Sequence, residues 1–317
     1  MKTTPVEPAD LAGVMPVPPL ARLPDHARSL DLESTRALVD HLASGGLRAL
    51  LFGGNAFLHH VTLDEYETLL AWMAALPGPL WPIPSVGPSF GRAMDQAVLL
   101  RRYAFPCAMA LPCADPRDAA GLERGWREFA ERAGIPLMLY LKDEHNLGSD
   151  VEAGLDVVAR LMADGTAVAV KYAVVRDVPG DDRYLEGLLA RAPRDRIVSG
   201  IGERPAVVHM QQFGLAGFTT GSGCLAPALS SALHAACVRG AYEEARDLRT
   251  AFLPHEDLRD RWGPARVLHA AVELAGICTT GPIPPYVSPL DEARRNQLRP
   301  VAQALREANQ QTREVTT

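Results

Sequence analysis

The chain has 317 residues, of which 47% are hydrophobic and 22% charged, with a formal net charge of −6. This composition is typical of a globular protein with a sizeable core, and no basic cluster predicts nucleic-acid binding. No apolar run reaches the roughly 18 residues that span a bilayer, and residues 1–10 lack the features of a signal peptide. We therefore expect a cytoplasmic protein without membrane contact. Five cysteines without a CxxC pair predict free thiols and no metal site.

Short apolar runs alternate with longer amphipathic segments up to about residue 240. We expect strands at 11–17, 47–52, 80–86, 106–111, 136–141, 166–172, 196–201 and 216–220. We expect helices at 31–43, 62–75, 90–103, 115–133, 150–163, 181–191, 205–213 and 226–238, the second opened by a capping box of Thr62 and Glu65. Eight strand–helix units imply a parallel sheet, and their number favours a closed (β/α)8 TIM barrel over an open sheet.

After residue 240 the alternation stops and the pattern becomes helical. Segments 242–252, 264–274 and 290–308 predict about three helices, and residues 310–317 are expected to fray. The chain is thus predicted to comprise a barrel over 1–239, which carries the catalytic site, and a C-terminal helical extension over 240–317.

One lysine is unusual because the chain otherwise takes nearly all its positive charge from arginine. Among 32 basic residues only Lys2, Lys142 and Lys171 are lysines. Lys171 lies inside the apolar run 167–175, where a charged side chain would lose its hydration. A desolvated lysine can lose its proton near neutral pH and form a Schiff base with a carbonyl compound, whereas an arginine cannot. The alternative is a lysine whose stem carries its charge to solvent.

Barrel active sites form at the carboxyl ends of the strands, where several polar residues fall. Tyr140 ends the strand next to that of Lys171, although it could equally be a core tyrosine. Other candidates follow the second, fifth and eighth strands: Gly53, Gly54 and Asn55; Asp143, Glu144 and His145; Thr219 and the four residues after it. Alternation along the sixth strand predicts Ala167, Ala169 and Lys171 on one face, with room for a pocket if that face is the interior.

The order of these residues resembles the dihydrodipicolinate synthase / N-acetylneuraminate lyase superfamily over almost the whole chain. The likeness rests on residues 53–55, 139–141, 169–171 and 217–221, with 226–227, 240–246 and 289–290 following in order. Its members are class I aldolases on a (β/α)8 barrel with three C-terminal helices, usually tetramers. The resemblance implies that Lys171 forms an imine and that Tyr140 moves protons beside it. It also implies that the loop at 53–55 binds the carboxylate of a 2-keto acid.

The chain departs from the family's synthases at three places. The synthases carry Gly-Thr-Thr-Gly-Glu after the second strand, whereas residues 53–57 are Gly-Gly-Asn-Ala-Phe and lack both hydroxyls. A tyrosine pair expected after the fourth strand is replaced by Cys113 and Ala114. The arginine that would bind a second substrate's carboxylate, five residues after Tyr140, is His145. These departures imply another keto acid than that of a true dihydrodipicolinate synthase.

Three functions are compatible with these residues. The first is a Schiff-base lyase or aldolase that acts on pyruvate or another 2-keto acid. The second is a dehydratase of a keto-deoxy sugar acid through the same imine, favoured by Asp143 and the missing tyrosine pair. The third is a catalytically silent keto-acid-binding protein. We expect no cofactor beyond the covalent lysine imine, and the expected partners are a small 2-keto acid and further copies of the chain in a dimer or tetramer.

Three other motifs have weaker interpretations. Residues 221–226 match GxGxxA, but their late position favours an anion-binding loop or a turn of small residues over a dinucleotide site. His59 and His60 lack an evident third metal ligand. Residues 255–259 are interpreted as the start of a helix with exposed charges that contributes to an interface.

Overall fold

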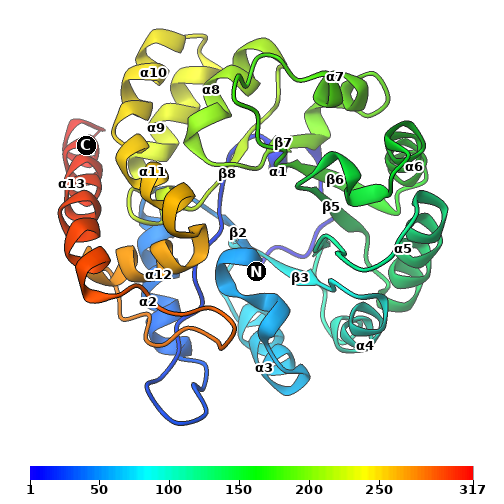
Figure 1. Cartoon of the computed structure of the whole chain (residues 1–317), viewed down its shortest axis with the longest axis horizontal. Coiled ribbons are helices and arrows are strands. Elements are labelled where there is room, and N and C mark those ends of the chain that lie inside the picture. The colour runs from blue at the N-terminus through cyan, green and yellow to red at the C-terminus, as the bar shows by residue number, and fades with distance from the viewer. Residues whose placement is uncertain (317) are drawn as a thin grey trace.

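The computed structural model describes residues 1–316, which contain eight parallel strands in a nearly closed barrel (Figure 1). The strands are β1 (Val14–Pro16), β2 (Ala49–Phe52), β3 (Trp81–Val86), β4 (Ala108–Ala110), β5 (Leu137–Leu141), β6 (Ala167–Tyr172), β7 (Ile197–Ser199) and β8 (Phe218–Thr220). They are hydrogen-bonded in the order β1-β8-β7-β6-β5-β4-β3-β2, and β1 also packs against β2. The predicted (β/α)8 TIM barrel is confirmed.

Helices surround the barrel because each pair of parallel strands needs a crossover connection. They are α2 (Leu32–Ser44), α3 (Leu63–Ala74), α4 (Phe90–Leu100), α5 (Ala119–Ala133), α6 (Val151–Ala163), α7 (Arg183–Leu189), α8 (Glu203–Gln212) and α9 (Pro227–Val238), whereas the short α1 (Pro8–Leu11) precedes β1. The predicted capping box opens α3, where the Thr62 side chain accepts from the Glu65 N–H and the Glu65 side chain accepts from the Thr62 N–H. No described helix is long and apolar enough to cross a membrane.

In the described part of the chain, four helices follow the barrel where about three were predicted. They are α10 (Tyr242–Thr250), α11 (Leu253–Trp262), α12 (Pro264–Leu274) and α13 (Glu292–Thr316). α13 also includes residues 310–316, which were expected to fray, and residue 317 lies outside the described residues. Whether the barrel and the extension are separate domains stays a prediction.

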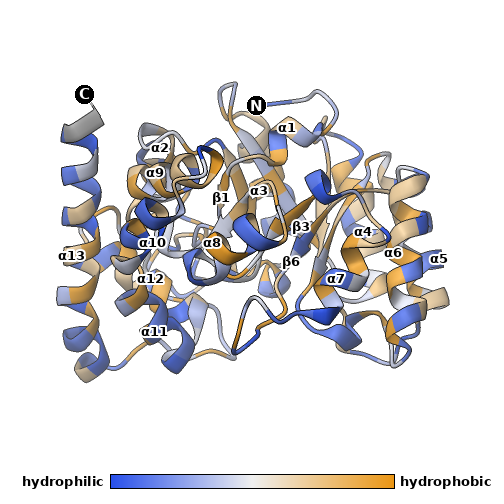
Figure 2. Ribbon diagram, turned by 90° about the horizontal axis from the view of Figure 1, so that it is seen from above, coloured by the Kyte–Doolittle hydropathy of each residue, from blue (hydrophilic) through white to orange (hydrophobic). Residues whose placement is uncertain are grey.

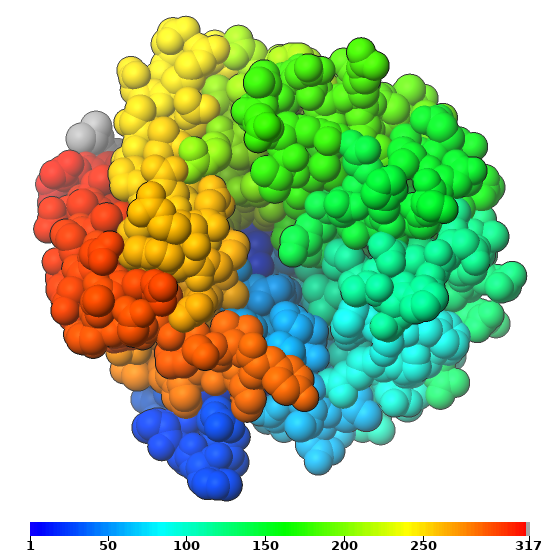
Figure 3. Space-filling view, in the orientation of Figure 1, coloured from blue at the N-terminus to red at the C-terminus, as the bar shows by residue number. Residues whose placement is uncertain are grey.

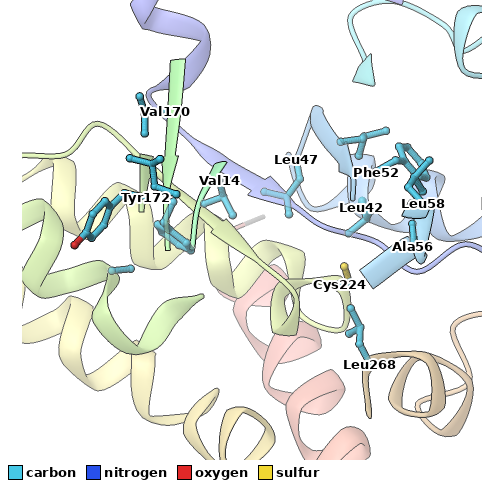
Figure 4. Packing of buried hydrophobic residues seen from close by; sticks show 14 of the residues in the cluster. Val14, Leu42, Leu47, Phe52, Ala56, Leu58, Val170, Tyr172, Cys224 and Leu268 are labelled. Atoms are coloured by element: carbon cyan, nitrogen blue, oxygen red, sulfur yellow. The ribbon is translucent and has the colours of Figure 1, made fainter. Parts of the chain in front are cut away.

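Apolar side chains form two layers, one inside the barrel and one between the barrel and its helices. The inner layer contains Met15, Leu51, Ile83, Met109, Met138, Ala169 and Val198. The outer layer joins segments far apart in sequence, and Figure 4 shows members from β1, α2, β2, β6 and α12. Because successive side chains of a strand point to opposite faces, each short strand contributes to both layers. Figure 2 shows the complementary pattern in the helices, whose hydrophilic residues lie mainly toward the outside.

A bulge in β6 corrects one prediction about the face that carries Lys171. Leu137 pairs with Ala167, but the next residue of β5, Met138, pairs with Ala169, so Val168 is an extra residue in β6. Ala167 consequently packs in the outer layer while Ala169 packs in the inner layer. The prediction that Ala167 shares a face with Ala169 and Lys171 is wrong, because a bulge resets the alternation of side chains.

The end of the barrel where the strands finish is hollowed. Figure 3 shows a central depression on this face, bordered on one side by the helices of the C-terminal extension. The N-terminus and α1 lie toward the opposite end of the barrel from α11 (Figure 2). The hollow is thus at the end where barrel enzymes bind their substrates.

Gly217 lies immediately before β8, against the segment that precedes β1. A β-carbon at Gly217 would overlap the Gly13 carbonyl oxygen and would lie 2.5 Å from the Leu11 carbonyl oxygen. We expect Gly217→Ala to lower the free energy of unfolding by about 1–3 kcal/mol, since a backbone cannot give way as a flexible side chain can. Denaturant unfolding measures the effect, with Gly13→Ala as the control because a β-carbon there meets nothing within 4 Å. Equal midpoints for the two variants would contradict the prediction.

Candidate active site

Lys171 and Tyr140 are cross-strand neighbours near the ends of β6 and β5. The strand register pairs their α-carbons directly. Tyr140 packs against the inner layer, and the Lys171 side chain is only 5% exposed. The Lys171 Nζ lies 4.2 Å from the centroid of the Tyr140 ring. The structure therefore brings together the two residues that the sequence analysis named as catalytic candidates, inside the barrel and not at its outer surface.

Burial has opposite effects on the pKa values of these two groups. Loss of hydration lowers the pKa of Lys171 to about 7, and the positive charges of Arg259 and Lys142 lower it further. Loss of hydration raises the pKa of Tyr140 to about 12, against a smaller opposing effect of Arg259. No ion pair joins the Lys171 amine to any described carboxylate. At neutral pH about half of the amine is therefore uncharged while the phenol keeps its proton, as a nucleophile and a proton donor require.

The loop after β2 contains the candidates Gly53, Gly54 and Asn55. The Asn55 side-chain amide donates a hydrogen bond of 2.9 Å to the Val17 carbonyl, and His269 donates to the Asn55 carbonyl at 3.1 Å. One role of Asn55 is therefore to tie this loop to the segment after β1 and to α12. A β-carbon at Gly53 would lie 2.9 Å from the end of the flexible Met109 side chain, whereas a β-carbon at Gly54 would meet nothing within 4 Å. The open space at Gly54 leaves the loop accessible from the mouth of the barrel.

Thr219 and His145 occupy different environments. Thr219 pairs with Met15 of the inner layer and is 1% exposed, so it lies within the barrel wall. His145 lies on the 3-10 helix Glu144–Leu147 after β5, and its side chain is exposed. Arg117 donates to the His145 carbonyl at 2.8 Å, which fixes the backbone of this loop. No hydrogen bond or ion pair links the His145 ring to another described residue.

Comparison with known proteins identifies the family. The model of the Dihydrodipicolinate synthetase family matches residues 13–305. The chain belongs to this family. A 4-hydroxy-tetrahydrodipicolinate synthase of Ralstonia nicotianae is 26% identical over 258 residues, which are 78% of this chain and 84% of that protein.

Solved structures show that the fold likeness extends over nearly the whole chain. The dihydrodipicolinate synthase of Oceanobacillus iheyensis matches with a TM-score of 0.78 at 21% identity, covering 94% of this chain and 97% of that one. YagE of E. coli K12, a prophage protein of the same family solved in complex with pyruvate, matches with a TM-score of 0.76 at 20% identity over 92% and 98% of the two chains. Membership of the dihydrodipicolinate synthetase family supports a lyase or aldolase activity.

Cys113, one of the residues that differ from the family pattern, lines a cavity that Tyr140 also lines. Cys113 stands where the family's tyrosine pair is expected, and its small side chain lines a cavity of about 390 Å³. Gly87, Pro112, Tyr140 and Asn146 also line this cavity, so it extends between the loops that follow β3, β4 and β5. Side chains of α4 and α5, such as Phe90 and Trp126, line the same cavity, so it lies between these helices and Tyr140.

Arg259 is the charged side chain of α11 that most affects the pKa values of Lys171 and Tyr140, and no sequence pattern identified it as a site residue. Residues 255–259 do lie near the start of a helix, but the prediction of exposed charges is wrong for His255 and Glu256, which are 0% and 3% exposed. α11 packs against α8 and α12, and this packing turns one of its faces inward. Arg259 is half-buried on that helix.

The GxGxxA segment is a turn that packs on α11. The 3-10 helix Ser222–Cys224 follows Gly221, and the Ser222 hydroxyl lies 2.8 Å from His255 Nδ1. Both of these side chains are fully buried, and burial lowers the pKa of His255 to about 3, so its ring stays neutral. The segment therefore has a structural contact that accounts for its small residues.

His59 and His60 form part of an aromatic cluster at the mouth of the barrel. Their ring centroids are 4.1 Å apart, and His60 packs edge-on against Tyr286 at 5.6 Å. Phe57 contacts both histidines and also His269 of α12. Within residues 1–316 no cluster of three or more metal-ligating side chains is present.

Proposed function

We propose that this protein is a class I lyase or aldolase that forms a Schiff base between Lys171 and pyruvate or another 2-keto acid. The observation that carries the proposal is the buried Lys171 amine, with a pKa of about 7, 4.2 Å above the ring of Tyr140. A surface lysine would be almost fully protonated at neutral pH and would not attack a ketone at a useful rate. No cofactor is needed because the iminium nitrogen itself accepts electrons.

The chemistry follows from attack of the neutral amine on the keto carbon. The Lys171 lone pair forms the C–N bond, and the carbinolamine takes a proton from solvent and loses its hydroxyl as water. Tyr140 is assigned to the proton transfers at the carbon next to the iminium. The resulting iminium accepts the electron pair released when a proton or an aldehyde leaves the adjacent carbon. The enamine then takes a proton, adds an aldehyde or expels a β-hydroxyl, and water hydrolyses the final imine. Proton transfer by a positioned group typically contributes 10²–10⁴-fold to such steps.

The loop after β2 is the proposed site for the carboxylate of the keto acid. Gly54 leaves space for the ligand, and Asn55 with Gly53 fixes the loop at the end of β2. We assign Thr219 to the wall of the same site and His145 to the rim. The absence of the two threonines of the synthase motif and of an arginine at position 145 supports a substrate other than that of dihydrodipicolinate synthase.

A sugar-acid dehydratase is the second candidate, because the same imine and enamine can expel a β-hydroxyl. Asp143 and Glu144 at the end of β5 supply carboxylates near the mouth, although Glu144 forms an ion pair with Arg176. A silent keto-acid-binding protein is the third candidate. It is the least supported, because an uncharged buried amine is a costly feature for binding alone. We further propose that the protein assembles as a dimer or tetramer.

Borohydride trapping tests the proposal directly. We expect incubation with pyruvate and borohydride to add one reduced keto-acid unit per chain, mapped by peptide mass spectrometry to Lys171. Only three lysines compete for the adduct, and Lys142→Arg is the matched control because that exposed lysine also lies near the mouth. The adduct should persist in Lys142→Arg. No adduct at Lys171 with any member of a broad panel of 2-keto acids would refute the Schiff-base mechanism and favour the silent binding protein.

A further inference from the structure

The guanidinium of Arg259 lies at the end of the barrel with no carboxylate partner among residues 1–316. Other arginines at the ends of helices form ion pairs, such as Arg204 of α8 with Asp257 and Arg191 with Asp156. Arg259 forms none, and its Nε is buried without a hydrogen-bond acceptor. A half-buried guanidinium without an anion is costly, because its planar set of donors is suited to binding a carboxylate.

Gly221 lets this guanidinium approach the loop after β8. A β-carbon at Gly221 would lie 2.5 Å from one terminal nitrogen of Arg259 and 2.6 Å from its Cζ. Any other residue at this position would displace the side chain. The glycine of the GxGxxA segment therefore has a second consequence, which is to seat Arg259 directly over the end of β8.

The charge of Arg259 reaches the reacting groups but is not neutralised by its acidic neighbours. Among the neighbouring charges, that of Arg259 has the largest effect on the pKa values of both Lys171 and Tyr140. The Arg259 charge also acts on Glu203 and Glu256, both buried, and Glu256 accepts a hydrogen bond of 2.9 Å from the Glu203 N–H. Burial raises the pKa of both carboxyls, to about 8 for Glu256, so Glu256 does not supply a full counter-charge at neutral pH.

The mouth therefore carries uncompensated positive charge on two sides of Lys171. Lys142 at the end of β5 also forms no ion pair with a described residue, and its charge acts on Lys171 as well. A hollow lined by charges of one sign concentrates anions of the opposite sign. Arg259 lies above β8, which β1 separates from β2, so it is distinct from the loop proposed for the keto acid's own carboxylate.

We propose that Arg259 binds a second carboxylate of the substrate, remote from the keto group, and thereby selects 2-oxo dicarboxylates over 2-oxo monocarboxylates. This inference rests on the proposed Schiff-base function and narrows its substrate class. A helix of the C-terminal extension then contributes directly to specificity. Arg259 acts as a binding residue, and it also keeps the Lys171 amine reactive by opposing its protonation.

The test compares borohydride trapping of pyruvate with that of 2-oxoglutarate and 2-oxoadipate. The measured quantity is the ratio of half-saturating concentrations for the dicarboxylates and for pyruvate. Both kinds of substrate meet the same amine, so a change in the ionisation of Lys171 cancels in this ratio. We expect the wild type to favour a dicarboxylate, and Arg259→Gln to reduce that preference about tenfold to hundredfold, the usual effect of losing a charge-assisted contact.

Two further variants keep the test decisive. Arg259→Lys retains the charge but loses the bidentate geometry, and we expect it to keep only part of the preference. Arg261→Gln is the matched control, because that arginine is exposed two residues further along α11 and should leave the ratio unchanged. An equal loss for pyruvate and the dicarboxylates, or no preference in the wild type, would overturn the role of Arg259. An absence of any adduct in the wild type would instead overturn the Schiff-base function on which it rests.

Discussion

Replacing Lys171 with methionine is expected to abolish catalysis and to stabilise the fold at the same time. Methionine matches the length and flexibility of the lysine stem but has no amine, so no iminium can form. Exchange of pyruvate methyl protons with D₂O, followed by proton NMR, reports enamine formation without knowledge of a second substrate. We expect this exchange to fall to the uncatalysed rate in Lys171→Met, and the borohydride adduct to disappear.

The gain in stability should depend on pH in a direction fixed by the lowered pKa of Lys171. The folded protein holds this pKa at about 7, against an ordinary value of 10.5. Between these values the unfolded chain binds a proton that the folded chain does not, so wild-type stability rises as the pH increases through this window. Burying the protonated amine lowers the free energy of unfolding of the wild type. This destabilisation is largest below pH 7 and disappears as the pH approaches 10.5. For a side chain 5% exposed, it corresponds to about 4 kcal/mol at neutral pH.

Urea unfolding of the two proteins as a function of pH checks this expectation. The difference in free energy of unfolding between Lys171→Met and the wild type should be largest near about pH 6 and should shrink by about pH 10. Lys2→Met is the control, since the N-terminal segment lies toward the opposite end of the barrel (Figure 2) and this replacement should alter neither exchange nor this pH dependence. If Lys171→Met were less stable than the wild type at neutral pH, burial would not lower the pKa of the Lys171 amine as described.

The fold was largely predictable because local patterns determine most of its elements. Near-continuous apolar runs identified all eight strands, and the Thr62 and Glu65 capping box located the start of α3. The bulge at Val168 was not predictable, since it depends on how β6 pairs with β5 and not on the residues of β6 alone. α11 was not predicted as a complete helix because its many charged residues show no apolar face in the sequence. Its inner face is buried only by packing against α8 and α12.

Some residues of the candidate site could be predicted from local sequence patterns, whereas others depend on contacts between distant parts of the chain. A lysine in a β-branched run, and a tyrosine at the matching point of the preceding strand, are local signals, and the register places them side by side. Arg259 is 88 residues from Lys171 in the chain, and nothing near it in sequence indicates that Gly221 admits its guanidinium. A glycine at a strand end and an arginine without an i,i+4 acid were both visible in the sequence. Only the tertiary structure shows that they meet.

Removing the hydroxyl of Tyr140 is expected to slow exchange of the pyruvate methyl protons by about 10²–10⁴-fold while leaving the borohydride adduct on Lys171 intact. The phenol has a pKa of about 12 because it is buried, so at neutral pH it holds a proton that it can donate and recover. Phenylalanine keeps the ring over which the Lys171 amine lies, so Tyr140→Phe removes the proton carrier without opening a cavity. Imine formation and proton transfer should therefore separate in this variant.

Tyr286→Phe is the matched control for this experiment. Tyr286 is 96% exposed at the mouth and packs against His60, so losing its hydroxyl should leave the exchange rate unchanged. If Tyr140→Phe exchanged protons as fast as the wild type, Tyr140 would be a packing residue beneath the amine. The proton would then have to travel through solvent or through the carboxylates after β5. If Tyr140→Phe instead lost the adduct, the phenol would be needed already for the loss of water from the carbinolamine, before any proton leaves the adjacent carbon.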